Sequence, residues 1–217
     1  MPTRITCLSI MRDSGSYLDR YLLQLSPLIR ELPDSRVVVV EGDSLDDTPA
    51  ALLKAQADRP WLHVVTDNTG RPKWGSVNHP DRWAHLESVW NKAMGCIDDR
   101  AEVVVCLESD LVWSWAVLRA CLAHVSLGVA PVVCPMLYGQ DHFYDTNGFR
   151  LPNGKPFNQF EPVIPDWDGR RFIMLQTGGG MLVGQAGVMR QGVWKNQCRL
   201  FVPGGVMVDT ELRIYHP

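Results

Sequence analysis

The sequence lacks several features that would assign it to a familiar class of protein. Its six cysteines include no Cys-x-x-Cys pair, so a structural zinc site of the usual spacing is not expected. No apolar stretch approaches the roughly 20 residues that a helix needs to cross a bilayer, and the start of the chain lacks the pattern of a signal peptide. We therefore expect a cytoplasmic protein, of a cell or of an infected host, with reduced thiols and no membrane insertion.

Three motifs of nucleotide-binding and hydrolytic enzymes are also missing. No Gly-Lys-Ser/Thr follows a glycine-rich loop, which excludes a Walker-type phosphate loop. The first apolar run leads into Arg12-Asp13-Ser14-Gly15 rather than into Gly-x-Gly-x-x-Gly, which argues against a dinucleotide dehydrogenase. No Gly-x-Ser-x-Gly occurs, and this absence disfavours an α/β-hydrolase.

The charge balance gives no sign of a general nucleic-acid-binding surface. The 217 residues carry a formal net charge of −3 at pH 7, so the chain has no overall basic field. This length suits one sizeable domain, and 46% hydrophobic with 21% charged residues is ordinary for a globular chain. A local basic groove stays open, because five cations flank the loops considered below: Arg12, Arg71, Lys73, Arg170 and Arg171.

Apolar, β-branched runs alternate with segments of helical periodicity along most of the chain. The pattern predicts strands at 5–10, 36–41, 61–66, 103–107 and 130–137, and helices over 18–32, 49–57, 83–97 and 115–127. Pro27 should kink or split the first helix. The apolar stripe of the helix from residue 83 is expected to pack on the sheet. Alternating strands and helices predict an α/β fold, with a mostly parallel sheet flanked by helices in a single domain.

One predicted strand, 103–107, ends directly in Glu108-Ser109-Asp110. Side chains alternate along an extended chain, so both carboxylates should point the same way. Two carboxylates at the carboxyl end of a sheet strand can hold Mg²⁺ or Mn²⁺, which prefer oxygen ligands and often share substrate phosphates. The competing interpretation is a solvated strand end, because such triplets are common. A metal–diphosphate site here would indicate an enzyme that uses nucleotide sugars.

A second acidic loop follows the strand at 36–41. Thr48 is well suited as an N-cap and Pro49 as the first helical residue, so the acids at 46 and 47 are explained by capping of the next helix. Capping does not explain Glu41 and Asp43, which lie nearer the strand end, where open α/β sheets bind ligands. These two acids are therefore candidate ligand-binding residues.

Five segments, in the same order, resemble motifs of the GT-A glycosyltransferases over roughly residues 4–213. Residues 41–48 resemble the family's Asp-Asp-Gly-Ser-x-Asp-x-Thr loop, and 108–110 resemble its metal-binding Asp-x-Asp. Residues 90–93 look like its Arg-Asn-x-Ala helix segment, and 178–183 look like its glycine-rich strand start. Residues 208–212 resemble its Glu-Asp-x-Glu-Leu motif on the acceptor side.

The chain departs from the family pattern at two of these motifs. Glu41-Gly42 stands where the family has two aspartates, and Val208 replaces the usual glutamate. The second departure leaves Asp209 as the only acid of its pair. The two departures concern residues to which the resemblance assigns donor binding and catalysis.

The resemblance implies a metal-dependent glycosyltransferase with one GT-A domain over residues 1–217. Residues 1–112 would form the nucleotide-sugar-binding half, and 113–217 the acceptor-side half, with a loop excursion at 139–171. The donor would contact seven residues: Arg12, Glu41, Asp43, Asn91, Glu108, Gly178 and Gly179. Mn²⁺ or Mg²⁺ would be held by Asp110, with Glu108 and His216 as further ligands. The competing interpretation of His216, which the end of the chain favours, is a frayed tail.

The same resemblance suggests how transfer would occur. Asp209 would act as the base that takes a proton from an acceptor hydroxyl in an inverting reaction, with Glu211 in reserve. If Asp209 only orients the acceptor, a retaining reaction is possible. The acceptor class stays open between a saccharide, a protein and a hydroxymethylated DNA base. Two other functions stay open as well, a sugar-1-phosphate nucleotidyltransferase and a non-catalytic nucleotide-sugar-binding module.

The loop excursion at 139–171 is unusually aromatic. Its six aromatic side chains would either form a stacking platform for a sugar or a base, or fold the loop back on the domain. They are Phe143, Tyr144, Phe149, Phe157, Phe160 and Trp167.

Overall fold

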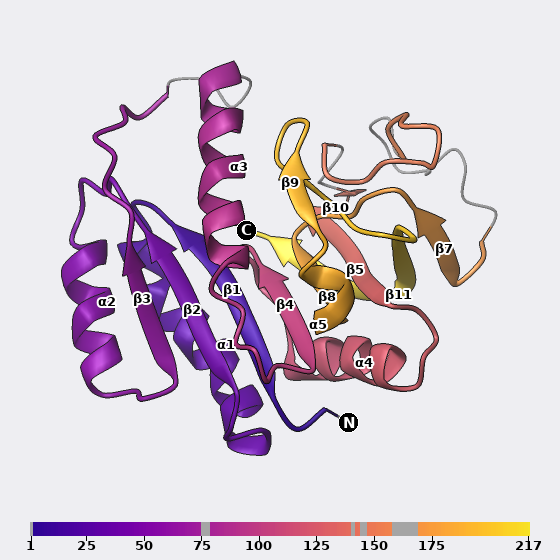
Figure 1. Ribbon diagram of the computed structural model, residues 1–217, viewed down its shortest axis with the longest axis horizontal. Helices are drawn as coiled ribbons and strands as arrows, with labels where there is room; N and C mark the ends of the chain where they lie inside the picture. The colour runs from indigo at the N-terminus through magenta and orange to yellow at the C-terminus, as the bar shows by residue number, and fades with distance from the viewer. Residues whose placement is uncertain (1, 75–78, 140–141, 144–146, 158–168) are drawn as a thin grey trace.

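The structure is a computed structural model, and it describes residues 2–74, 79–139, 142–143, 147–157 and 169–217. In this part of the chain, the main sheet has nine strands in the order β3-β2-β1-β4-β8-β5-β11-β7, with β6 paired to β5 (Figure 1). A small second sheet pairs β9 with β10. The strands are β1 Ile5–Met11, β2 Arg36–Glu41, β3 Leu62–Thr66, β4 Val103–Leu107, β5 Val132–Gly139, β6 His142–Phe143, β7 Phe172–Leu175, β8 Met181–Gln185, β9 Val193–Lys195, β10 Arg199–Phe201 and β11 Val206–His216.

The sheet is mostly parallel. β3, β2, β1 and β4 run parallel, and β5 and β11 are parallel to each other. β8 is antiparallel to both of its neighbours, β4 and β5, and β7 is antiparallel to β11. The helices are α1 Leu18–Glu31, α2 Thr48–Ala57, α3 Pro80–Met94, α4 Trp115–Ser126 and the short α5 Ala186–Met189, with a 3₁₀ turn η1 at Gly15–Tyr17. The predicted α/β fold with a single domain is thereby confirmed.

Helices cover both faces of the sheet, and the strand side chains show which helix covers which face. Tyr21 of α1 donates a hydrogen bond to Ser9 Oγ of β1, so α1 covers the face on which Ser9 points. The Sγ of Cys106 on β4 contacts Met94 of α3, and Cys106 is in register with Leu8, which points the opposite way from Ser9. α3 and α1 therefore lie on opposite faces, as Figure 1 shows with α3 in front of the sheet.

The structure bears on two local predictions about helices. Pro27 lies inside α1, which continues from Leu18 to Glu31, so the helix is not split there. Thr48 is the first helical residue of α2 rather than its N-cap, which is Asp47. The Thr48 hydroxyl instead accepts a hydrogen bond of 2.7 Å from the backbone N–H of Ser14, and so ties the loop after β1 to the loop after β2.

The loop excursion at 139–171 is folded back on the domain where the structure describes it. Phe143, Phe149 and Phe157 are buried, and the Phe143 ring meets the Phe149 ring edge-on at 5.0 Å between centroids. These three side chains therefore form core rather than a stacking platform. Tyr144, Phe160 and Trp167 lie outside the described residues.

The burial of the remaining side chains fits a globular domain with one core. The central strands β2 and β4 are almost entirely buried, as their continuous Val-rich runs predict. All six cysteines are free thiols. Among the described residues, no helix combines the length and the apolar character needed to span a membrane.

Candidate active site

A cleft of about 1190 Å³ opens where β1 and β4 end, between α3 and the segments that follow β5 and β8. Open α/β sheets bind ligands at this edge, because the loops after parallel strands converge there. The loop after β1 contributes Arg12 and Asp13, and the turn after β4 contributes residues 108–110. The opposite wall consists of Asn147, Gly148, Arg150, Pro156, Gly178, Gly179, Trp194 and Cys198.

The predicted acidic triplet Glu108-Ser109-Asp110 lines the floor of this cleft. The strand ends at Leu107, so the triplet forms a turn rather than a continuation of the strand. The turn is fixed by neighbouring loops. Glu108 N–H donates to the Gly180 carbonyl at 2.9 Å, and Ser109 Oγ donates to the Ile10 carbonyl at 3.2 Å. The Asp110 carboxylate is thus carried on a well-supported backbone.

The last strand brings His216 to this acidic turn. β11 runs parallel to β5, and Tyr215 exchanges two backbone hydrogen bonds with Val112, at 2.8 and 2.9 Å. This pairing places His216 Nε2 3.1 Å from Asp110 Oδ2. The two side chains are 27% and 36% exposed, so both are open to a ligand in the cleft.

The Asp110–His216 pair fits a divalent cation such as Mn²⁺, which accepts both carboxylate oxygen and imidazole nitrogen. Within the described ranges no group of three or more His, Cys, Asp or Glu side chains could hold a metal ion by itself. The protein would therefore supply two ligands from Asp110 and His216, with Glu108 on the same floor. Substrate phosphates and water would complete the shell, as is usual for Mg²⁺ and Mn²⁺ at phosphate sites.

The glycine segment 178–180 borders the cleft through its first two residues, and it is tightly packed at Gly178 and Gly180. A Cβ at Gly178 would come within 3.0 Å of Cys134 Sγ, which leaves no room for a side chain. Gly180 has a φ of +70°, a left-handed conformation that favours glycine. Gly178 and Gly179, the two glycines predicted to contact the donor, both line the cleft.

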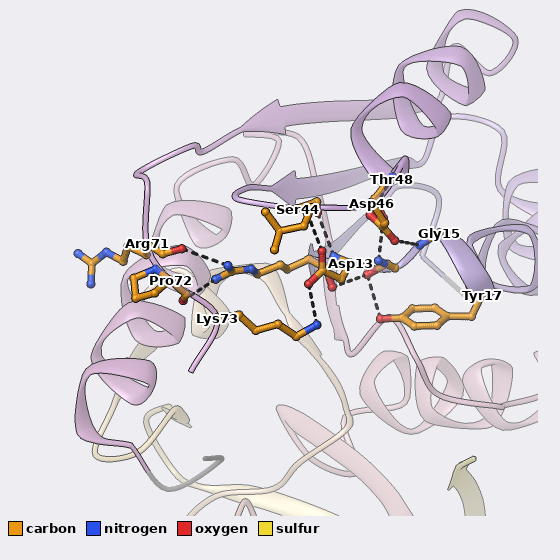
Figure 2. Close-up of polar contacts among 12 residues, drawn as sticks. Asp13, Gly15, Tyr17, Ser44, Asp46, Thr48, Arg71, Pro72 and Lys73 are labelled. Carbon is orange, nitrogen blue, oxygen red and sulfur yellow. Dashed lines mark hydrogen bonds and ion pairs between the residues drawn. The ribbon is translucent and has the colours of Figure 1, made fainter. Parts of the chain in front are cut away.

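Arg12 lines the cleft, but its side chain mainly holds a neighbouring loop. Its Nη1 and Nη2 donate to the carbonyls of Pro72 and Arg71, both at 3.1 Å. Next to it, Asp13 accepts hydrogen bonds from Leu45 N–H at 2.7 Å and from Lys73 Nζ at 3.0 Å. Figure 2 shows these contacts, which join the loops after β1, β2 and β3 at the mouth of the cleft.

Asp43 organises the loop after β3. Its carboxylate accepts hydrogen bonds from the N–H groups of Thr69, Gly70 and Arg71 and from the Thr69 hydroxyl, at 2.8–3.2 Å. Burial alone would raise the pKa of Asp43, but these hydrogen bonds outweigh it and lower the pKa below its ordinary value. Asp43 is absent from the cleft lining, so its effect on a ligand would pass through the loop.

Two other predicted donor-binding residues, Glu41 and Asn91, are absent from the cleft lining. Glu41 is 1% exposed and in register with Met11, two residues beyond Ser9, so it points to the α1 side of the sheet. Asn91 uses both ends of its amide on Trp194, donating to its carbonyl at 2.9 Å and accepting from its N–H at 3.0 Å. Asn91 therefore fastens β9 to α3.

The predicted base, Asp209, is absent from the cleft lining. It is fully buried and contacts His124 of α4, with 2.9 Å between His124 Nε2 and Asp209 Oδ2. Arg171 donates to it from Nε and Nη2, at 3.0–3.3 Å, and Glu211 N–H donates at 3.1 Å. An acceptor hydroxyl has no access to this carboxylate, so the geometry argues against a role as base.

Glu211 does not replace Asp209 at the cleft. Its side chain is 63% exposed and pairs with Arg171 Nη1 at 3.0 Å, again outside the cleft lining. The motif-like segment 208–212 is a strand that pairs with β5 and β7. Both predicted catalytic carboxylates thus belong to a cluster that joins β11 to α4 and to the start of β7.

Sequence reasoning missed the aromatic character of the cleft. Trp83 and Leu86 of α3 line it, and Trp90 stacks on Trp194 with 4.5 Å between ring centroids. α3 packs against β1 and β2 as expected, but Trp83, Leu86 and Trp90 of its apolar stripe also border the cleft. Arg82, whose guanidinium lies 5.1 Å from the Trp83 ring centroid, extends this wall. Three tryptophans within 74–90 were the available signal.

The same architecture occurs in solved glycosyltransferase structures. A fragment of TarS from S. aureus, residues 1–349 in complex with UDP, aligns with a TM-score of 0.58 and 14% identity, covering 98% of this chain and 60% of that fragment. The mannosyltransferase PcManGT from Pyrobaculum calidifontis, in complex with GDP-Man and Mn²⁺, aligns with a TM-score of 0.60 and 13% identity, covering 99% and 56%. The chain has the GT-A fold. GalNAc-T7 with UDP, GalNAc and Mn²⁺ also shares this fold, with a TM-score of 0.56 and 12% identity, covering 98% and 43%.

The likeness to these proteins is one of fold. The GT-A domain seen here spans about 60% or less of the length of the structures that it matches. No protein-family model matches the sequence, and a search of curated protein sequences gives no match.

Proposed function

We propose that the protein is a metal-dependent glycosyltransferase that moves a sugar from a nucleotide-sugar donor to an acceptor hydroxyl. The observation that carries this proposal is the pairing of Asp110 with His216 on the floor of a large cleft, at the carboxyl end of a GT-A sheet. The TarS fragment was solved with UDP, PcManGT with GDP-Man and Mn²⁺, and GalNAc-T7 with UDP, GalNAc and Mn²⁺. These ligands support a nucleotide-sugar donor.

In this proposal the donor diphosphate lies over the acidic turn. Mn²⁺ or Mg²⁺, held by Asp110 and His216 with Glu108 nearby, would neutralise the charge that develops on the nucleoside diphosphate as the glycosidic bond breaks. Gly178 and Gly179 line the cleft, and the donor sugar would lie beside their backbone. Residues 1–112 would thus serve mainly the donor, and residues 113–217 the acceptor.

The acceptor would enter between the α3 wall and residues 147–156. The Arg82–Trp83 pair lines this space and would offer positive charge and a ring face, whereas Trp90 and Trp194 are buried and stacked on each other. Among the described residues, the lining from 147 to 198 contains no carboxylate, so no base is assigned on this side. The acceptor class stays open between a saccharide, a protein and a hydroxymethylated DNA base.

Donor binding and turnover test the proposal together. Purified protein should bind UDP or GDP by calorimetry more tightly with Mn²⁺ than with EDTA. It should release nucleoside diphosphate slowly from a matching nucleotide sugar, because water can replace the acceptor. A non-catalytic binding module would bind without release, and a nucleotidyltransferase would release pyrophosphate from a nucleoside triphosphate and a sugar 1-phosphate. Failure to bind either nucleotide would refute the proposal.

A further inference from the structure

We propose that Lys73 binds the donor diphosphate, and that the Asp13 carboxylate holds the Lys73 ammonium group at the cleft wall until the donor arrives. This inference rests on the proposed function, because it assigns a further residue to the donor site. Lys73 carries no motif signal, and its role follows from its position beside the cleft.

The two side chains lie at the mouth of the cleft. Lys73 Nζ is 3.0 Å from Asp13 Oδ2, and both residues belong to the cleft lining together with Asp110. The Lys73 side chain is 69% exposed, whereas that of Asp13 is 17% exposed. The ammonium group is thus the mobile partner, on a flexible four-carbon stem.

Asp13 keeps its place without Lys73. Its backbone is left-handed, with a φ of +50°, and its N–H donates to Ser44 Oγ at 2.9 Å. Its Oδ1 accepts from Leu45 N–H at 2.7 Å. The pKa of Asp13 is lowered, mainly by the hydrogen bond from Leu45 N–H and to a smaller extent by the hydrogen bond from Lys73, so the carboxylate stays charged. It therefore retains a partner when the ammonium group leaves.

The main chain of Lys73 is fixed by Arg12. The Arg12 guanidinium binds the carbonyls of Arg71 and Pro72, directly before Lys73, and Figure 2 shows these bonds beside the Asp13–Lys73 contact. Arg12 is in this sense a positioning residue. Only the Lys73 side chain needs to move to reach an anion in the cleft. An exposed ion pair contributes little to stability, so little free energy is lost when the Lys73 ammonium group leaves Asp13 for a diphosphate.

Calorimetry with UDP and GDP in the presence of Mn²⁺ tests this arrangement in the full chain. Lys73→Met keeps the apolar stem and should weaken nucleotide binding roughly 10-fold or more, the loss expected for a charge-assisted hydrogen bond. Asp13→Asn should tighten binding, because the ammonium group is released. Asparagine tolerates a left-handed backbone and its carbonyl can still accept from Leu45. Lys54→Met, at an exposed position of α2, is the matched control and should bind as wild type does.

The double variant Lys73→Met/Asp13→Asn separates the two roles. If Asp13 acts by holding Lys73, the double variant should bind like Lys73→Met. Tightening that persists in the double variant would mean that Asp13 repels the diphosphate directly, and would overturn the holding role. Unchanged binding of Lys73→Met, with normal binding by wild type, would overturn the inference and leave the proposed function standing. No binding by wild type would overturn both.

Discussion

Replacing Asp209 by asparagine separates a structural role from a catalytic one. The carboxylate is completely buried and accepts hydrogen bonds from Arg171 and from Glu211 N–H, and it contacts His124. Asparagine has nearly the same shape, but its NH₂ group would face donors where a charged oxygen now accepts. We therefore expect Asp209→Asn to destabilise the fold.

The size of the loss follows from burial. Removing one partner of a buried charge pair costs about 3–5 kcal/mol, and a hydrogen bond to a charged group contributes about 1.5–3 kcal/mol. The Arg171 side chain is 44% exposed, so water can solvate its guanidinium in the variant. The loss for Asp209→Asn should therefore lie near the lower end of the range for a buried charge pair. A loss of about 2–3 kcal/mol corresponds to roughly 4–12 °C in Tm for a domain of this size.

Thermal and urea unfolding measure this loss, and nucleotide binding by calorimetry measures the site separately. Glu211→Gln is the control, because Glu211 pairs with the same Arg171 but is 63% exposed, and its Tm should stay near that of wild type. Donor affinity should persist in folded Asp209→Asn, since the residue lies away from the cleft. If this variant melted as wild type does but had lost transfer activity, our reasoning would be wrong and the base role would be restored.

Three further predictions concern the site and its supports. Mn²⁺ should no longer tighten the binding of UDP or GDP in Asp110→Ala or in His216→Ala. The Tm of both variants should change little, because both side chains are partly exposed. If Mn²⁺ still tightened binding in both variants, this metal site would be excluded. The lowered pKa of Asp43 means that its contribution to stability is present above its unfolded pKa of about 3.9 and is lost as pH falls through the lower folded value. Asp43→Asn should therefore lose less stability than wild type between about pH 5 and pH 3 in urea titrations, and equal losses would contradict this. Asn91→Ala removes two hydrogen bonds to the Trp194 backbone and should cost about 1–3 kcal/mol in urea unfolding, whereas Asn153→Ala at an exposed turn should not.

The sequence by itself determined the order of strands and helices from β1 to β5, and the place of the acidic turn. Continuous Val-rich runs are typical of strands buried on both faces, and those at Val37–Val40 and Val103–Val105 became central strands. Glu108 and Asp110 follow the second of these runs directly. Parallel strands end at an edge of the sheet where loops converge, so a short local pattern was enough to place these two residues at that edge, where both line the cleft.

Only the tertiary structure decided which distant side chains share a site. His216 meets Asp110 because β11 returns beside the turn after β4, and no local pattern contains that pairing. The face on which Asp209 points depends on strand register, and one residue of shift along β11 would reverse it. Helical periodicity likewise identified the apolar face of α3. It did not show what that face contacts, because the same apolar side chains can pack against a sheet or line a cleft.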